Sequence, residues 1–122
     1  MRIKIKALDK VFSEYVRLLS GGYCKRCGKH VGWKNLDNAH FMGRIRYTVR
    51  WDIRNTVALC KTCHYKIDTD CFAKTELLLT LLSKEEIAGL RKLSNMTTKD
   101  YPIDKEALLK SYKEKVKMLK EV

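Results

Sequence analysis

Hydrophobic and polar residues alternate with two different periods in the first half of the chain. Residues 9–20 begin with an aspartate, carry apolar side chains at helical spacing and are followed by two glycines. This pattern predicts an amphipathic helix with Asp9 as its N-cap. Residues 36–42 and 55–60 are short segments of apolar or β-branched character. They predict two strands that pair around an arginine-rich loop, residues 43–54.

Helical periodicity dominates the second half of the chain. Ser83 and Glu86 have the spacing of a capping box, a reciprocal pair that favours a helix start. Asp104 is a further N-cap. The pattern predicts, in order, a short helix from Lys61, continued helix over 71–82, a helix from the capping box to about Ser94, and a last helix over 105–121. Residues 94–102 form a linker-like segment.

These elements fit one α+β domain over residues 1–122. A chain of 122 residues with 45% hydrophobic composition can bury one modest core but has little room for a second. We expect an N-terminal helix, a core over about residues 23–70 and a helical extension over about 72–121. The leucine-rich run 77–82 favours either the core or a subunit interface, which leaves open a homodimer through the C-terminal helices.

Four of the five cysteines form two Cys-x-x-Cys pairs, Cys24 with Cys27 and Cys60 with Cys63. Two such pairs supply the four thiolates of a tetrahedral structural Zn²⁺ site. A redox pair or plain buried cysteines are the alternatives, which are less favoured because redox chemistry needs only one pair. The sequence therefore predicts a zinc site that stabilises a small core, with Cys71 as a small buried residue outside it.

The chain is strongly basic, with 26 Lys and Arg against 14 Asp and Glu and a formal net charge of +12. Residues 1–71 carry 15 basic and 6 acidic side chains, a net charge of +9. The first half is therefore the expected contact surface for a polyanion such as nucleic acid or an anionic membrane. No apolar run is long enough to cross a bilayer, and no signal peptide is recognisable. We expect a soluble, cytoplasmic protein without a membrane partner.

Residues 35–64 concentrate two of the three histidines, four arginines and the second cysteine pair. The segments AHF, GR, RWDIRN and ALCKTCH follow one another there, in an order that resembles the HNH endonucleases of the ββα-metal (His-Me finger) superfamily. The likeness is greatest to small phage-type members, such as the NinG/Rap recombination endonucleases and the HNH proteins of phage packaging modules. It covers about residues 23–68 and implies a zinc-stapled ββα-metal core in a protein of the host cytoplasm.

The resemblance implies a role for each polar residue of the motif. His40 would be the general base that activates water, and its ordinary pKa of about 6.5 suits that task near neutral pH. Asn55 would orient the imidazole through a hydrogen bond. His64 would bind one divalent cation, Mg²⁺ or Mn²⁺, that stabilises the scissile phosphate and the leaving oxygen. The zinc of the four cysteines would be structural and separate from this ion.

One position departs from the family pattern. Many HNH proteins place a metal ligand immediately before the base, where this chain has Ala39. Asp68 follows His64 by four residues and would share its helical face, so we expect this pair to hold the ion. Asp37 is the second candidate, because strand alternation points it away from His40 unless the strand bends or bulges.

Several arginines lie close to the expected site, opposed there only by Asp52. A charge run is commonly a solvated face, but guanidinium groups beside a phosphate-cleaving site favour phosphate contact. Such contacts carry little base information, so we expect weak sequence specificity. The residues concerned are Arg44, Arg46, Arg50 and Arg54. Of the other residues nearby, Trp33 and Trp51 are expected in the core, and His30 on the surface or beside the zinc.

Two functional classes follow from these features. The first is a metal-dependent DNA endonuclease that acts on duplex or branched DNA, in phage-type recombination or as a nickase in DNA packaging. The second is a non-catalytic, zinc-stapled DNA-binding module, for which Ala39 is the main argument. The ordered set of His40, Asn55 and His64 favours the nuclease, since a pure binding module has no reason to keep the three together.

Overall fold

The computed structural model describes residues 2–121, with side chains from residue 5 onward. Within this range the chain is α+β, with six α-helices, two 3-10 helices and a two-stranded antiparallel sheet. In chain order the elements are α1 (Arg2–Leu19), η1 (Trp33–Asn35), β1 (Asp37–His40), α2 (Tyr47–Arg50), η2 (Ile53–Asn55), β2 (Thr56–Leu59), α3 (Lys61–Thr69), α4 (Cys71–Leu81), α5 (Lys84–Ser94) and α6 (Lys105–Lys120). None of the described helices combines the length and apolar composition that a membrane span requires.

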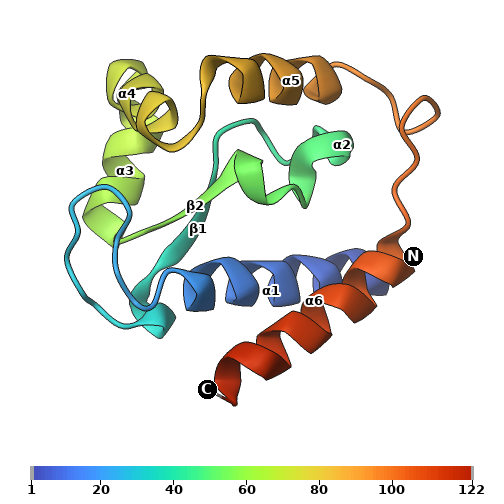
Figure 1. Cartoon of the computed structure of the whole chain (residues 1–122), viewed down its shortest axis with the longest axis horizontal. Helices are drawn as coiled ribbons and strands as arrows, with labels where there is room; N and C mark the ends of the chain where they lie inside the picture. Colours follow the sequence, from blue (N-terminus) through green and yellow to red (C-terminus); the bar gives the residue numbers. More distant parts are fainter. Residues whose placement is uncertain (1, 122) are drawn as a thin grey trace.

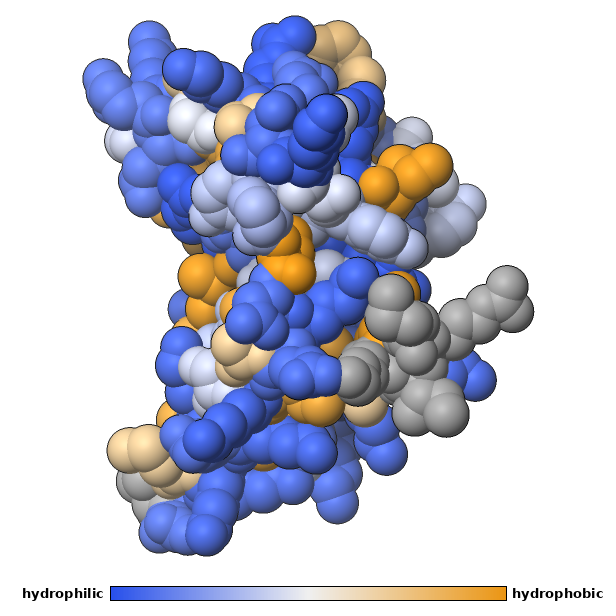
Figure 2. Space-filling view, turned by 90° about the vertical axis from the view of Figure 1, so that its right-hand side faces the viewer, coloured by the Kyte–Doolittle hydropathy of each residue, from blue (hydrophilic) through white to orange (hydrophobic). Residues whose placement is uncertain are grey.

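The hairpin of β1 and β2 lies in the middle of the molecule, between two groups of helices (Figure 1). Helices α1 and α6 cross on one side, where α1 packs against α6 and both strands. Helices α4 and α5 lie on the other side, and the short α2 packs against α5. Figure 2 shows apolar residues gathered where these two parts of the molecule meet.

The core lies between α1 and the hairpin. Leu8 and Phe12 of α1 are 0% and 1% exposed, and Leu59 of β2 is 0% exposed. All four residues of β2 are buried, whereas in β1 only Ala39 is. Burial of one large apolar side chain contributes roughly 1.5–3 kcal/mol, so the contact of α1 with β2 is a main source of stability for this half of the chain.

The predicted hairpin is confirmed, with strands slightly shorter than expected. The two strands pair antiparallel, with Asp37 opposite Leu59 and His40 opposite Thr56. The segment that joins them is more ordered than the expected loop, because it folds into α2 and η2. His40, Asn55 and the four arginines lie on this hairpin and its connection.

The N-terminal helix begins earlier than predicted. Asp9 was expected to be its N-cap, but α1 begins at Arg2, so Asp9 lies inside the helix. The apolar stripe of α1 extends back through Leu8, which is buried in the core, and Ile5, which packs against it. This burial stabilises two further turns. The carboxylate of Asp9 is therefore available for partners distant in sequence.

The predicted helix starts in the second half are confirmed. Ser83 and Glu86 form a complete capping box at the start of α5, and the Asp104 side chain accepts a hydrogen bond in the first turn of α6. Asp70 performs the same function for α4, where its carboxylate accepts two backbone N–H groups and separates α4 from α3. These caps satisfy N–H groups that have no partner within the helix.

The prediction that Cys71 is buried is wrong, because its side chain is exposed at the start of α4. Helix α4 turns Ala73 and Leu77 toward the core, which leaves Cys71 on its outer side. The leucine-rich run is likewise divided, since Leu77 is buried whereas Leu79 and Leu81 are 53% and 38% exposed. A subunit interface through these leucines stays a prediction.

Candidate metal centre and histidine clusters

The four cysteines of the two Cys-x-x-Cys pairs lie together. Cys24 and Cys27 come from the loop after α1, whereas Cys60 and Cys63 come from the junction of β2 and α3. Their sulfurs all lie within 4.8 Å of one another, with 3.9 Å between Cys27 and Cys60. A tetrahedral zinc with bonds of about 2.3 Å places its sulfurs about 3.8 Å apart. The cluster could therefore hold a metal such as zinc.

The electrostatics of the cluster fit a divalent cation. Burial raises the pKa of the Cys24 thiol, but backbone N–H groups directed at its sulfur lower that pKa to about 6. Burial and the neighbouring sulfurs raise the pKa of Cys63 to about 12, against the effect of the Arg26 guanidinium 3.6 Å from its sulfur. Four thiols at this spacing cannot all ionise unaided. A bound cation would allow all four to lose their protons.

Backbone hydrogen bonds hold the first cysteine loop in shape. The Cys24 N–H donates to the carbonyl of Lys29 at 2.9 Å, and the Gly28 N–H donates to the carbonyl of Cys24 at 2.9 Å. Gly28 has φ +77, a conformation that residues with a Cβ rarely adopt. The Lys25 N–H donates to the carbonyl of Ala58 in β2 at 3.0 Å. The loop is thus attached to the strand that leads into the second cysteine pair.

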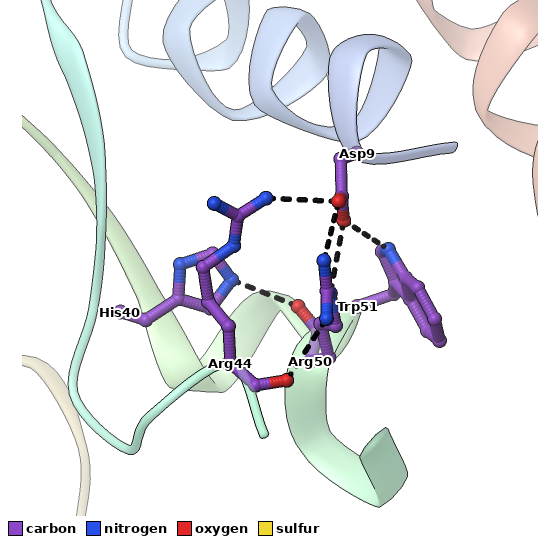
Figure 3. Close-up of polar contacts among 5 residues, drawn as sticks. All are labelled: Asp9, His40, Arg44, Arg50 and Trp51. Carbon is purple, nitrogen blue, oxygen red and sulfur yellow. Dashed lines mark hydrogen bonds and ion pairs between the residues drawn. The ribbon is translucent and has the colours of Figure 1, made fainter. Parts of the chain in front are cut away.

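His40 stands at the end of β1 with one ring nitrogen engaged. Its Nε2 lies 2.9 Å from the carbonyl oxygen of Arg50, to which it donates (Figure 3), so Nδ1 is the nitrogen that can accept a proton. Burial lowers the pKa of His40; the Arg50 carbonyl opposes this effect, and the charge of Arg44 adds to it. The lowered pKa therefore favours the neutral form of the imidazole at pH 7. It lines a cavity of about 140 Å³, with Asn38 beside it.

Asp9 connects α1 to the segment that follows His40. Its carboxylate accepts hydrogen bonds from Arg50 at 2.6 and 3.1 Å, from Arg44 at 2.8 Å and from the indole N–H of Trp51 at 2.9 Å (Figure 3). Burial raises the pKa of Asp9, but these donors outweigh burial and hold it below its usual value. This role could not be recognised from the sequence, because Asp9 also satisfies the local rule for an N-cap.

Asn55 fixes the connection between the strands rather than the imidazole itself. It is 0% exposed, and its side chain accepts from the Met42 N–H at 2.8 Å and donates to the carbonyls of Met42 and Val49 at 3.2 and 3.1 Å. In the described structure no hydrogen bond joins Asn55 to His40. The carbonyl of Arg50 orients the ring instead, and Asn55 acts on it only through the backbone of the connection.

His64, in the first turns of α3, lies between two carboxylates. Its Nδ1 is 2.9 Å from Asp37, and its Nε2 is 3.3 Å from Asp68. Lys61 also pairs with Asp37. Of the described residues, the four cysteines are the only group of three or more metal-ligand side chains within common reach. The two carboxylates contact different nitrogens of His64 and do not converge on one point.

The two histidines of the motif belong to separate clusters. In the part of the chain that the structure describes, no hydrogen bond or ion pair joins the cluster of His40 and Asp9 to that of His64 and Asp37. Asp37 and His40 are three residues apart in β1, about 10 Å along a strand, and alternation turns their side chains to opposite faces. The structure therefore places Asp9 in the same cavity as His40 and brings two carboxylates to His64, but it does not bring the histidines to each other.

The four arginines mostly have partners within the protein. Arg44 and Arg50 pair with Asp9, and Arg54 pairs with Asp52. Arg46 donates to the carbonyl of Ser94 and the side chain of Asn95. The Arg50 side chain is 14% exposed, whereas that of Arg44 is 58% exposed. Arg50 therefore serves mainly to hold the fold, and only the more exposed arginines are accessible to a ligand.

The other residues singled out in the sequence are divided between core and surface. Trp51 is buried, as predicted. Trp33 is only half-buried and has the cations of Arg17, Lys34 and Lys120 within 6 Å of its ring centre. His30 is exposed, and its ring packs edge-on against a tyrosine.

No family model, curated protein or solved structure matches the chain. Comparison with known proteins therefore adds nothing to these assignments.

Proposed function

We propose that this chain is a metal-dependent endonuclease of the HNH type that hydrolyses DNA phosphodiester bonds, with His40 as the general base. The state of His40 is the observation that carries the proposal. A main-chain carbonyl 2.9 Å away fixes which nitrogen holds the proton. Burial lowers the pKa, so the ring is neutral and can accept a proton from water near pH 7.

His64 is the proposed protein ligand of a catalytic cation. One imidazole and one carboxylate, completed by water, suit a hard and exchangeable ion such as Mg²⁺ or Mn²⁺. Asp37 is the better second ligand, because it lies closer to His64 than Asp68 does, at 2.9 against 3.3 Å, and is less exposed, at 25% against 62%. Such an ion supplies Lewis-acid stabilisation of charge on the phosphate. The four cysteines would hold a separate, structural zinc.

The substrate is proposed to be duplex or branched DNA, bound through its phosphates. Arg44 and Arg46 are exposed enough to reach the phosphate backbone of DNA. Phosphate contacts give little preference for particular base sequences. A role in recombination predicts preferential cleavage of a four-way junction. A role as a nickase in DNA packaging predicts cleavage of linear duplex instead, and cleavage of the two substrates side by side separates these roles.

Replacing His40 with alanine should lower the rate of plasmid nicking by at least about a hundredfold, since a general base contributes about 10²–10⁴ in rate. The measurement is nicking of supercoiled plasmid with Mg²⁺ or Mn²⁺. His30→Ala is the matched control, because His30 is exposed and lies outside both clusters, and it should cleave at the wild-type rate. Undiminished cleavage by His40→Ala would exclude His40 as the base.

Replacing His64 with alanine should abolish cleavage but leave the four-cysteine site intact. The substitution removes the proposed ligand of the catalytic ion, while the four sulfurs come from other residues. Metal analysis of the purified variant should find about one zinc per chain, and its affinity for DNA should stay close to that of the wild type. Loss of zinc, or full cleavage, would contradict this division between the two metals.

A non-catalytic DNA-binding module is the second candidate function. The separation of the His40 and His64 clusters favours it, together with Ala39 at the position where HNH proteins often place a metal ligand. Such a module would bind DNA with the same salt dependence but would not nick plasmid with any divalent ion. The nicking assay of the wild-type chain across Mg²⁺, Mn²⁺ and other divalent ions therefore decides between the two.

A further inference from the structure

Helix α6 carries an exposed stripe of lysines, which we name the lysine track. Lys110, Lys113 and Lys117 follow one another at spacings of three and four residues, so they share one face of the helix. All three are exposed. In the described part of the chain, no carboxylate forms an ion pair with any of them. The track therefore presents three positive charges to solvent.

The track lies on a flank of α6, beside its apolar face. Tyr112 and Val116 of that apolar face are buried, and α6 packs on α1. By helical spacing Glu106 shares the face of the track at its first turn, and Glu114 and Glu121 border the track toward solvent. Because its apolar face is covered, α6 cannot lie in a lipid interface as an amphipathic helix would. Figure 2 shows the lower part of the molecule, built by α1 and α6, covered mainly by hydrophilic residues.

Further cations continue the track to the last residue of α6 and onto α1 and η1. Lys120 lies one turn after Lys117 and is 5.6 Å from the ring centre of Trp33. Arg17 and Lys34 approach the same ring at 5.2 and 5.8 Å. Side chains from α1, η1 and α6 thus gather positive charge around one indole. Glu14 pairs with Lys120 and neutralises part of this positive charge.

Because ion pairs within the protein engage some of the arginines, the lysine track is more important as a candidate phosphate-binding surface than the sequence suggested. Arg50 and Arg54 pair with aspartates, although the sequence favoured both as phosphate ligands. A formal charge of +12 nevertheless requires uncompensated cations elsewhere on the surface. The lysine track supplies three of them in one line, in the half of the chain whose overall charge is lower.

The spacing of the track fits the backbone of a nucleic-acid duplex. Lys110 and Lys117 are seven residues apart, or about 10 Å along a helix axis. Successive phosphates of one DNA strand advance about 3.4 Å along the duplex axis, so the same length spans about three base pairs. Flexible lysine side chains can then each reach a phosphate of one strand, as point charges without base selectivity.

From this geometry we infer that the lysine track is a contact surface for the phosphate backbone of double-stranded DNA, in addition to the region around His40. The inference rests on the proposed function for the identity of the polyanion, but it does not depend on cleavage. It makes α6 a binding element of the protein rather than only a cover for α1.

The test compares two triple variants of the full chain. Lys110→Gln/Lys113→Gln/Lys117→Gln removes the track, and Lys84→Gln/Lys92→Gln/Lys99→Gln removes three exposed lysines from α5 and the turn after it. Both variants lower the formal charge by the same three units. Binding of a labelled duplex of about 20 base pairs is titrated at several salt concentrations, since each lost phosphate contact reduces the salt slope by about 0.9.

The track variant should bind the duplex about tenfold more weakly at about 0.1 M salt, and its salt slope should fall by between about two and three units. The control variant should keep the wild-type affinity within about twofold, and all three proteins should have the same Tm. Equal losses in both variants would overturn the inference, because net charge alone would then explain binding. Preferential binding to double-stranded RNA or to anionic phosphatidylserine vesicles would overturn it as well.

The two proposals can fail separately in this experiment. Track-dependent binding without plasmid nicking would support the lysine track and defeat the nuclease. Plasmid nicking with unchanged binding by the track variant would support the nuclease and defeat the track. Failure of the wild-type chain to bind the duplex at all would overturn the track directly.

Discussion

Replacing Cys60 with serine should unfold the N-terminal half of the protein. Cys60 joins the second cysteine pair to β2, and its sulfur is 3.9 Å from that of Cys27 in the loop after α1. Structural zinc contributes about 10–16 kcal/mol in small zinc-dependent domains, which is comparable to the whole stability of a typical domain, about 5–15 kcal/mol. We expect the variant to lose bound zinc and its cooperative thermal transition. Metal analysis and circular dichroism during heating measure both.

Cys71→Ser is the matched control for this prediction. It makes the same chemical change at an exposed thiol outside the cluster, so zinc content and Tm should both equal those of the wild type. Cys24→Ser should behave like Cys60→Ser, because each removes one of the four sulfurs. A Cys60→Ser protein with wild-type Tm and full zinc content would show that the cluster does not stabilise the fold.

Features set by local spacing could be predicted from the sequence. The capping box of Ser83 and Glu86 satisfies backbone groups within one turn, so four residues are enough to recognise it. The two strands can be recognised from their apolar and β-branched residues. Two Cys-x-x-Cys pairs imply one shared metal-binding cluster, whatever the length of the chain between them. In each case the interacting groups are close in sequence or belong to a motif with fixed chemistry.

Features set by distant partners could not be predicted. Asp9 and Arg50 are 41 positions apart, and no spacing rule connects an aspartate of α1 to an arginine in the segment between the two strands. Without that partner, Asp9 resembles a cap and Arg50 resembles a phosphate ligand. The exposure of Cys71 was missed for a similar reason, because only the packing of Ala73 and Leu77 decides which side of α4 faces outward.

Arg50 connects Asp9 to His40. Its guanidinium bonds to Asp9 of α1, and its carbonyl accepts the hydrogen bond of His40. The same residue therefore fixes both the packing of α1 over the hairpin and the tautomer of the proposed base. Because the charge of Asp9 raises the pKa of His40, against the effect of burial, the carboxylate also influences the proton affinity of the imidazole.

Replacing Asp9 with alanine should lower the free energy of unfolding by about 3–5 kcal/mol, the usual cost of leaving a buried charge without its partner. The Arg50 side chain is 14% exposed, and the indole N–H of Trp51 would lose its acceptor as well. Denaturant unfolding at pH 7 measures the loss. Glu14→Gln on the same helix is the control, because Glu14 pairs with the half-exposed Lys120, and its cost should be within about 1 kcal/mol.

The contribution of Asp9 should also depend on pH in a definite direction. Its hydrogen bonds hold the pKa of the folded-state carboxyl below the ordinary value, which is about 3.9 for an unfolded chain. The stabilisation is therefore fully present above about pH 5 and is lost as the pH falls through the folded-state pKa. Unfolding free energies of the wild type and of Asp9→Ala should accordingly converge as the pH is lowered from 5 toward 2. A difference that stays constant over this range would mean that Asp9 stabilises the fold by packing alone, without its charge.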